Sequence, residues 1–393
     1  MIGKLISKIC PIFMVPENNP VNEEVYLGDR KNTPFIYEKR ENKYIYPLVK
    51  FKDEQVIIEK LCLIDFKGDT IYKAIELQQV KQENCIHYIV LMARNDNEAE
   101  IYYTKGLKIN EDSYRSLLNK VSLKENDSIK VSFDVTEKGI DVYLSLKDIE
   151  NRMVEFKIKE NKSKINHFGL IAPVGNASEN PDKFPVIYLK KFNMVEQKGT
   201  ELYVKIDGTN LKPAKLFPLC NFKRVYLARY SYFNNMKELN SDYTGIIEGV
   251  EVNMDTEEIN IDNCTYLIKM NDGYPEIKCV KRIDSNSEMK ITFSPAIPDI
   301  ISLKDNIEIQ GHFSISVDEV KGIMGGVYSV KKSKDEVIFK MNPQKGWQPM
   351  PGKLWMKTYL WNCDIKIIEN KLHVKSKWSR SEIILTYDKL KAK

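Results

Sequence analysis

The feature that most constrains this chain is a two-residue alternation of apolar and polar side chains that recurs along most of its length. In "IKVSFDV" (129–135) every second residue is apolar and the residues between them are polar. The turn "TEKG" follows, and 140–146 and 153–160 then repeat the alternation. Successive side chains of a strand point to opposite faces, so this period predicts strands with one buried face. Three such strands joined by polar turns predict an antiparallel meander.

The same signal extends over the rest of the chain, which contains 21 tyrosines and 15 phenylalanines that suit a half-buried pleated surface. Strand patterns include 44–51, 223–232, 244–254, 306–317, 353–362 and 371–379. One segment near 111–122 has helical spacing instead, and we predict a single helix there. Too few helical patterns exist to supply the crossovers of a parallel sheet. The predicted fold class is therefore all-β, with antiparallel sheets of barrel or sandwich type, including a lipocalin-like arrangement, and few helices.

The length of the chain, 393 residues, predicts two domains because one hydrophobic core rarely serves so long a chain. Residues 196–220 are dense in proline and turn-forming residues, which is typical of a connection. We predict an N-terminal β-rich domain at 1–200 that contains the helix, and a C-terminal β-barrel-like domain at 201–393.

Charge, cysteine and histidine usage narrow the class of protein. Lys and Arg number 60 and Asp and Glu number 55, and their alternation along the chain leaves no basic run of the kind that binds nucleic acid. The seven cysteines are scattered, which is typical of free thiols in a reducing compartment, and no apolar run is long enough for a membrane helix. We expect a cytoplasmic protein without a membrane span. No spacing indicates a metal site or a cofactor, and the oligomeric state is not indicated.

The glycine-rich segment "GIMGGVYSV" (322–330) raises the question of a phosphate-binding loop. Such a loop leads into a helix whose N-terminal N–H groups hold the anion. Here a β-type sequence follows, so Gly325 and Gly326 predict a β-bulge or a close approach of two backbones.

All four tryptophans lie near the C-terminal end of the sequence, and the first of them, Trp347, stands in the segment "GWQPMPG". Pro349 and Pro351 each lack a backbone donor, so this segment is a stiff connection. The alternation resumes at 353 and continues at 371–378, where Trp378 lies opposite a face of lysines and His373 that must be wet. One face of the first of these strands combines lysines with aromatic residues: Lys353, Trp355, Lys357, Tyr359 and Trp361.

Three arrangements fit this lysine–aromatic face, and the sequence leaves all three open. An exposed platform would stack its rings on sugars or bases and bind acidic groups with its lysines. A wall of a barrel lumen would hold an amphipathic or acidic small molecule. The third arrangement is structural: the rings cover one end of a barrel, and the lysine stems lie over them.

Two other strands carry polar side chains that would be functional in an interior position. In 223–232, Arg229 shares a face with apolar residues, and an interior arginine needs a carboxylate partner or an anionic ligand group. In 306–317, Glu308 and His312 share the polar face, which could perform acid–base chemistry in a lumen. A structural ion pair for Arg229 and a solvent-facing position for His312 are the alternative interpretations.

The general plan resembles that of the two-domain, lipocalin-like proteins related to carotenoid hydratases and some pericyclases. This resemblance rests on length, all-β pattern and aromatic-rich strands. It implies a similar architecture, and it assigns a role to no individual residue.

We predict that the C-terminal β domain binds a small amphipathic or apolar molecule, acidic ones included. The alternatives are an isomerase, cyclase or hydratase that acts on a hydrophobic substrate, with His312 and Glu308 as the nearest titratable groups, and a carbohydrate or protein interaction module. Whether the protein is an enzyme stays open. The residues predicted to bind the ligand are Arg229, Trp347, Lys353, Trp355, Lys357, Tyr359 and Trp361.

Overall fold

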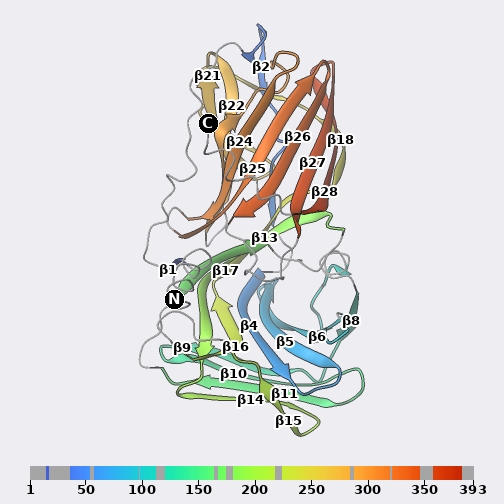
Figure 1. Ribbon diagram of the computed structural model, residues 1–393, viewed down its shortest axis with the longest axis vertical. Coiled ribbons are helices and arrows are strands. Elements are labelled where there is room, and N and C mark those ends of the chain that lie inside the picture. Colours follow the sequence, from blue (N-terminus) through green and yellow to red (C-terminus); the bar gives the residue numbers. More distant parts are fainter. Residues whose placement is uncertain are drawn as a thin grey trace. The chain divides into compact units, whose positions relative to one another are not determined.

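The computed structural model confirms an all-β protein with antiparallel sheets (Figure 1). Its sheets fit the sandwich-like form, whereas a closed barrel and a lipocalin-like arrangement stay predictions. The helix predicted near 111–122 falls mostly on 112–119, which lie outside the described residues. At its expected end the prediction is wrong, because Val121 and Ser122 belong to strand β8 (Val121–Glu125), which pairs with β7 (Ala99–Tyr103). The structure describes residues 15–16, 36–53, 57–96, 98–111, 120–162, 167–173, 180–216, 224–283, 287–318, 321–345 and 357–382.

The chain forms two compact units, and each is assembled from several segments. Unit 1 comprises Met1–Asn19, Glu54–Leu170 and Ile187–Met236. Unit 2 comprises Pro20–Asp53, Ile171–Val186 and Lys237–Lys393. The boundary expected at residue 200 lies within the last segment of unit 1, and the two predicted domains stay a prediction.

Unit 1 is built on a branched sheet. One branch has the order β16-β4-β5-β6-β7-β8, and the other runs from β4 through β15, β14, β11 and β10 to β9. The β7–β8 pair is parallel, and the other pairs are antiparallel. The strands are β4 (Ile57–Lys67), β5 (Tyr72–Gln82), β6 (Cys85–Arg94), β7 (Ala99–Tyr103), β8 (Val121–Glu125), β9 (Lys130–Thr136), β10 (Gly139–Lys147), β11 (Met153–Glu160), β14 (Thr200–Ile206), β15 (Thr209–Pro213) and β16 (Val225–Tyr232).

The meander predicted from 129–160 is present as β9, β10 and β11. Val142 is paired with Phe133 on one side and with Ile158 on the other, as the alternation requires. These side chains join one core with residues of the other branch, such as Ile64 and Leu77. The two branches therefore cover a shared core, in the manner of a sandwich.

In three strands, one part of the strand belongs to unit 1 and the other part to unit 2. One of these strands also pairs with a short N-terminal strand. The three strands are β12 (Phe168–Pro173), which pairs with β1 (Val15–Pro16), β13 (Lys183–Glu196) and β17 (Asn234–Ser241).

Unit 2 contains a ten-stranded antiparallel sheet with β18 at one edge and β20 at the other. Its order is β18 (Tyr243–Ile247), β28 (Lys371–Glu382), β27 (Lys357–Ile368), β26 (Glu336–Lys345), β25 (Lys321–Ser333), β24 (Glu308–Val317), β23 (Glu288–Ile297), β22 (Tyr274–Ile283), β21 (Cys264–Asn271) and β20 (Glu258–Ile261). Short strands complete the unit: β2 (Lys43–Ile45) pairs with β19 (Val250–Val252), and β3 (Phe51–Asp53) pairs with β17.

The strand predicted over 44–51 is interrupted, because its middle is a connection between β2 and β3. Pro47 lies in this connection and has no N–H group to donate to a ladder. The apolar residues on both sides of it, Tyr46 and Leu48, are nevertheless buried. Apolar content alone therefore made this segment resemble a continuous strand.

Two-residue turns set the register of several hairpins. Asp207–Gly208, Asp262–Asn263 and Asp272–Gly273 have positive φ at both positions. This backbone belongs to the type I′ turn, whose twist matches that of the flanking strands. Asp and Asn tolerate the left-handed conformation because their short side chains bond locally. The position of each turn then determines which face of the strands points inward.

The glycine pair at 325–326 is a close-packed bulge in β25, as predicted. The register with β26 shifts between Gly325 and Gly326. A Cβ atom at Gly326 would overlap the carbonyl oxygen of Asn342 and the ring of Phe313. The pair is therefore a packing feature of the sheet.

We expect Gly326→Ala to lower the free energy of unfolding by about 1–3 kcal/mol, because the added methyl group meets backbone and a buried ring. Urea denaturation would measure the loss. Ser329→Thr, which adds a methyl group at a half-buried position of the same strand, is the control and should change stability little. Equal stability of both variants would contradict the close approach.

Candidate functional site

The structure separates the residues predicted to bind a ligand. Trp347, Lys353 and Trp355 lie outside the described residues, and Lys357 is described only as a backbone position of β27. Tyr359 and Trp361 are buried in unit 2. Their side of β27 is an interior wall of that unit.

Arg229 belongs to unit 1, where its Nη1 donates to Oδ2 of Asp65 at 2.9 Å. The structural interpretation of this arginine, an ion pair with a carboxylate, therefore accounts for its charge. Its neighbour Glu76 accepts a hydrogen bond of 2.6 Å from Gln78, and burial raises the pKa of the Glu76 carboxyl.

The other sequence candidates lie on β24. His312 is half-buried, whereas Glu308 is exposed and its carboxylate lies 3.7 Å from Nζ of Lys331. The polar face of β24 therefore meets water at Glu308.

Aromatic side chains of β27 and β28 fill part of the interior of unit 2. Trp361 lies opposite Trp378 in the ladder, with ring centroids 6.4 Å apart. Phe184 stacks on Trp378 at 5.0 Å and meets Tyr359 edge-on at 4.7 Å. Burial raises the pKa of Tyr359 to about 12. On β28 the predicted buried face is confirmed, because Leu372, Val374, Ser376 and Trp378 are buried. On the other face Lys371, Lys375 and Lys377 are exposed as predicted, whereas His373 is half-buried.

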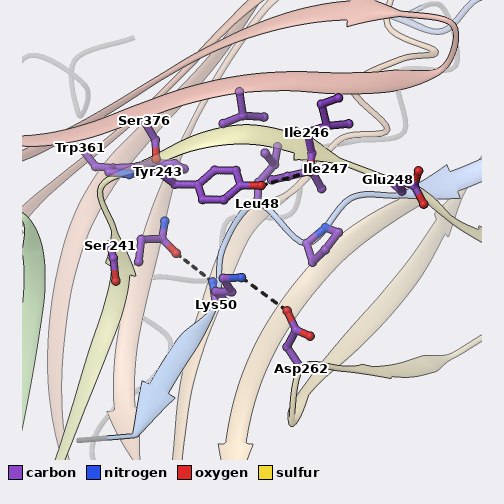
Figure 2. A pocket seen from close by; sticks show the side chains of 13 residues that line it. Leu48, Lys50, Ser241, Tyr243, Ile246, Ile247, Glu248, Asp262, Trp361 and Ser376 are labelled. Atoms are coloured by element: carbon purple, nitrogen blue, oxygen red, sulfur yellow. Dashed lines mark hydrogen bonds and ion pairs between the residues drawn. The ribbon is translucent and has the colours of Figure 1, made fainter.

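A pocket of about 230 Å³ lies in unit 2 against Trp361 (Figure 2). One wall is the edge of the sheet formed by β27, β28 and β18. Tyr243 is paired with Ser376, and Ile247 with Leu372, so alternate residues of these strands share the face that carries Trp361. This wall is mostly apolar, as is common in small-molecule sites.

The opposite wall is the connection between β2 and β3, which contributes Pro47, Leu48 and Lys50. Lys50 and Asn240 hold this connection in place through two hydrogen bonds. The Asn240 N–H donates to the Lys50 carbonyl at 3.0 Å, and the Lys50 N–H donates to Oδ1 of Asn240 at 2.9 Å. Asn240 has φ of 47°, which an asparagine tolerates more readily than most residues.

Two buried N–H donors at this pocket lack a partner among the described residues. These donors are Nδ2 of Asn240 and Nε1 of Trp361. Asn240 is 3% exposed and Trp361 is 2% exposed. Because Oδ1 of Asn240 accepts from the Lys50 N–H, the orientation of the amide is determined by its hydrogen bonds. An unpaired buried donor costs about 1–3 kcal/mol, so a ligand acceptor would recover part of that cost.

Charged groups surround the pocket. Nζ of Lys50 lies 3.4 Å from Oδ2 of Asp262, which stands in the turn between β20 and β21. Glu248 pairs with Lys371 at 2.7 Å, and this ion pair lowers the pKa of the Glu248 carboxyl, which stays charged near neutral pH. Figure 2 shows Lys50 and Asp262 together, apart from Trp361, Ser376 and Tyr243.

Tyr243 lies along β18 because Gly245 leaves room for its ring. Its hydroxyl donates to the Ile246 carbonyl at 3.1 Å, and a Cβ atom at Gly245 would overlap that hydroxyl. Tyr243 is 41% exposed and lines the pocket from an edge strand. Tyr243 is thus the lining aromatic residue that meets both the pocket and water.

A second hollow in unit 2, of about 290 Å³, is more polar. Arg40 and Asp299 line it, and Nη1 of Arg40 donates to Oδ1 of Asn370 at 3.0 Å. Both oxygens of the buried Asp299 carboxylate accept hydrogen bonds from Ser302, and burial raises its pKa. Since its buried groups already have partners, the pocket at Trp361 is the stronger candidate.

The sequence located only Trp361 among the residues of this pocket. Lys50 lies in the connection between β2 and β3, and Asn240 lies near the end of β17. Their hydrogen bonds join positions 190 residues apart. The local signals were Pro47, which indicates a connection, and the turn-forming residues Asn240 and Ser241, which end a strand; neither indicates that the two segments meet.

We expect Trp361→Ala to lower the free energy of unfolding by about 3–5 kcal/mol, because it empties a buried aromatic cluster. Trp361→Phe keeps most of the contacts and should cost about half of that or less. Chemical denaturation of both variants gives the comparison. A fully stable Trp361→Ala protein would contradict the interior position of this ring.

Searches of family models, of curated proteins and of solved structures found no match to this chain. Among the described residues, no helix is long and apolar enough to cross a membrane. No group of three or more His, Cys, Asp or Glu side chains in the described part of the chain could hold a metal ion.

Proposed function

We propose that the protein binds a small, partly apolar molecule in the pocket of unit 2 beside Trp361. The observation that supports this most directly is that one hollow is lined by an apolar wall and by two residues with unpartnered, buried N–H donors. Small-molecule sites usually combine apolar walls with a few convergent polar groups that orient the ligand. At about 230 Å³, the hollow suits a small occupant.

Binding fits the charged groups at this pocket better than proton transfer does. Lys50 is paired with Asp262, and Glu248 is paired with Lys371. A general acid or base needs a pKa close to the working pH, whereas the pKa of Glu248 is lowered. The enzyme alternatives and the carbohydrate or protein interaction module stay predictions from the sequence.

A titration of the full-length protein with fatty acids, isoprenoids, aromatic acids and oligosaccharides tests the proposal. We expect saturable binding of an apolar or amphipathic class, measured by calorimetry. Ile247→Phe should weaken that binding about tenfold or more, because the half-buried Ile247 lines the pocket and the larger ring fills it.

The matched control is Thr244→Phe, which places the same ring at an exposed position of β18 that does not line the pocket. It should bind as the wild type does. Binding that survives Ile247→Phe unchanged, or a wild-type protein that binds no member of the panel, would contradict the proposed site.

A further inference from the structure

We infer that the occupant of this pocket is an apolar monocarboxylate, and that Lys50, Asn240 and Trp361 recognise its carboxylate group. This inference rests on the proposed function and names its ligand class. It follows from the polar groups of the residues that line the pocket: two buried, unpartnered N–H donors in its wall and one ammonium group. A carboxylate has two oxygens with about four acceptor positions, which is enough for three donors.

Lys50 supplies the counter-charge. Its side chain is 33% exposed, and the carboxylate of its partner Asp262 is 66% exposed at 3.4 Å. Exposed ion pairs of this kind contribute little to stability, so the ammonium group can exchange Asp262 for a ligand carboxylate at low cost. The backbone of Lys50 is fixed by its two hydrogen bonds to Asn240, so the exchange needs motion only of the side chain.

The N–H donors of Asn240 and Trp361 would orient the ligand. Oδ1 of Asn240 is already occupied by the Lys50 N–H, which leaves Nδ2 for a ligand. Nε1 of Trp361 can donate but not accept, so it can pair only with an acceptor on the ligand. Both nitrogen atoms are buried in this structure, so pairing with them requires a side-chain movement at the pocket wall. Tyr243 lines the pocket from an edge strand and is 41% exposed, so its ring can move once its hydroxyl leaves the Ile246 carbonyl.

The acids near the pocket limit the charge of the ligand. Asp262 and Glu248 both line the hollow, and each carboxylate is in an ion pair with a lysine. A second negative charge on the ligand would be repelled by them. The remaining walls, from Leu48, Ile247 and Val374, receive an apolar body. A monocarboxylate therefore fits better than a phosphate monoester or a dicarboxylate.

Calorimetry of the full-length protein with octanoate, 1-octanol and octyl phosphate tests this class, because the three probes share one apolar chain. We expect octanoate to bind at least about tenfold more tightly than either of the others. Lys50→Met should weaken octanoate binding by about tenfold or more and leave octanol binding within about twofold. Lys50→Arg, which keeps the charge, should restore most of the octanoate affinity.

The matched control is Lys52→Met on β3, since Lys52 is exposed and does not line the pocket. It should bind octanoate as the wild type does. Asn240→Asp keeps the acceptor for the Lys50 N–H and tolerates the same backbone, but it replaces the donor with a carboxylate. It should abolish octanoate binding and spare octanol.

The outcomes distinguish a wrong ligand class from a wrong site. Equal affinity for octanoate and octanol, or an equal loss of both in Lys50→Met, overturns the carboxylate assignment and leaves the proposed pocket standing. Tighter binding of octyl phosphate also overturns it. Absence of binding by all three probes and by the wider panel overturns the proposed function itself.

Discussion

The antiparallel ladder between β27 and β28 is the constraint on which the interior of unit 2 depends. It places Trp361 directly opposite Trp378, and the two indoles then pack with Phe184, Phe339 and Tyr359. A shift of either strand by one residue would turn its own indole to the other face of the sheet. The same register sets Ser376 and Val374 beside Trp361, and β18 extends their face to the sheet edge. The pocket lies where this aromatic interior ends.

The pocket combines this wall with the connection between β2 and β3. The paired hydrogen bonds of Lys50 and Asn240 hold one end of that connection, and the Tyr266 hydroxyl donates to the Val49 carbonyl at 3.0 Å. The bonds of Lys50 and Asn240 continue the ladder of β3 and β17 by one position. Ligand groups on a connection beside a rigid sheet are a common arrangement, because the sheet tolerates variation in the loops that it supports.

The sequence predicted most of the strand architecture and little of the site. Alternation located the meander of β9 to β11, the buried face of β28 and the bulge at Gly325–Gly326, because each depends on local chemistry. It also selected Trp361 but not its partners. Asn240 and Lys50 meet through contacts that are remote in sequence, and Arg229 is satisfied by Asp65, which is equally remote. Periodicity carries no information about such pairs.

The most direct test of the account is a ¹⁵N spectrum of the tryptophan indole N–H groups, recorded during a titration with octanoate. The spectrum of Trp361→Phe assigns the Trp361 signal. We expect that signal to shift downfield and saturate, because its N–H gains a charged acceptor, while the Trp378 indole moves less. Saturable binding that leaves the Trp361 signal in place, with the shift confined to another indole, would contradict a site at this pocket.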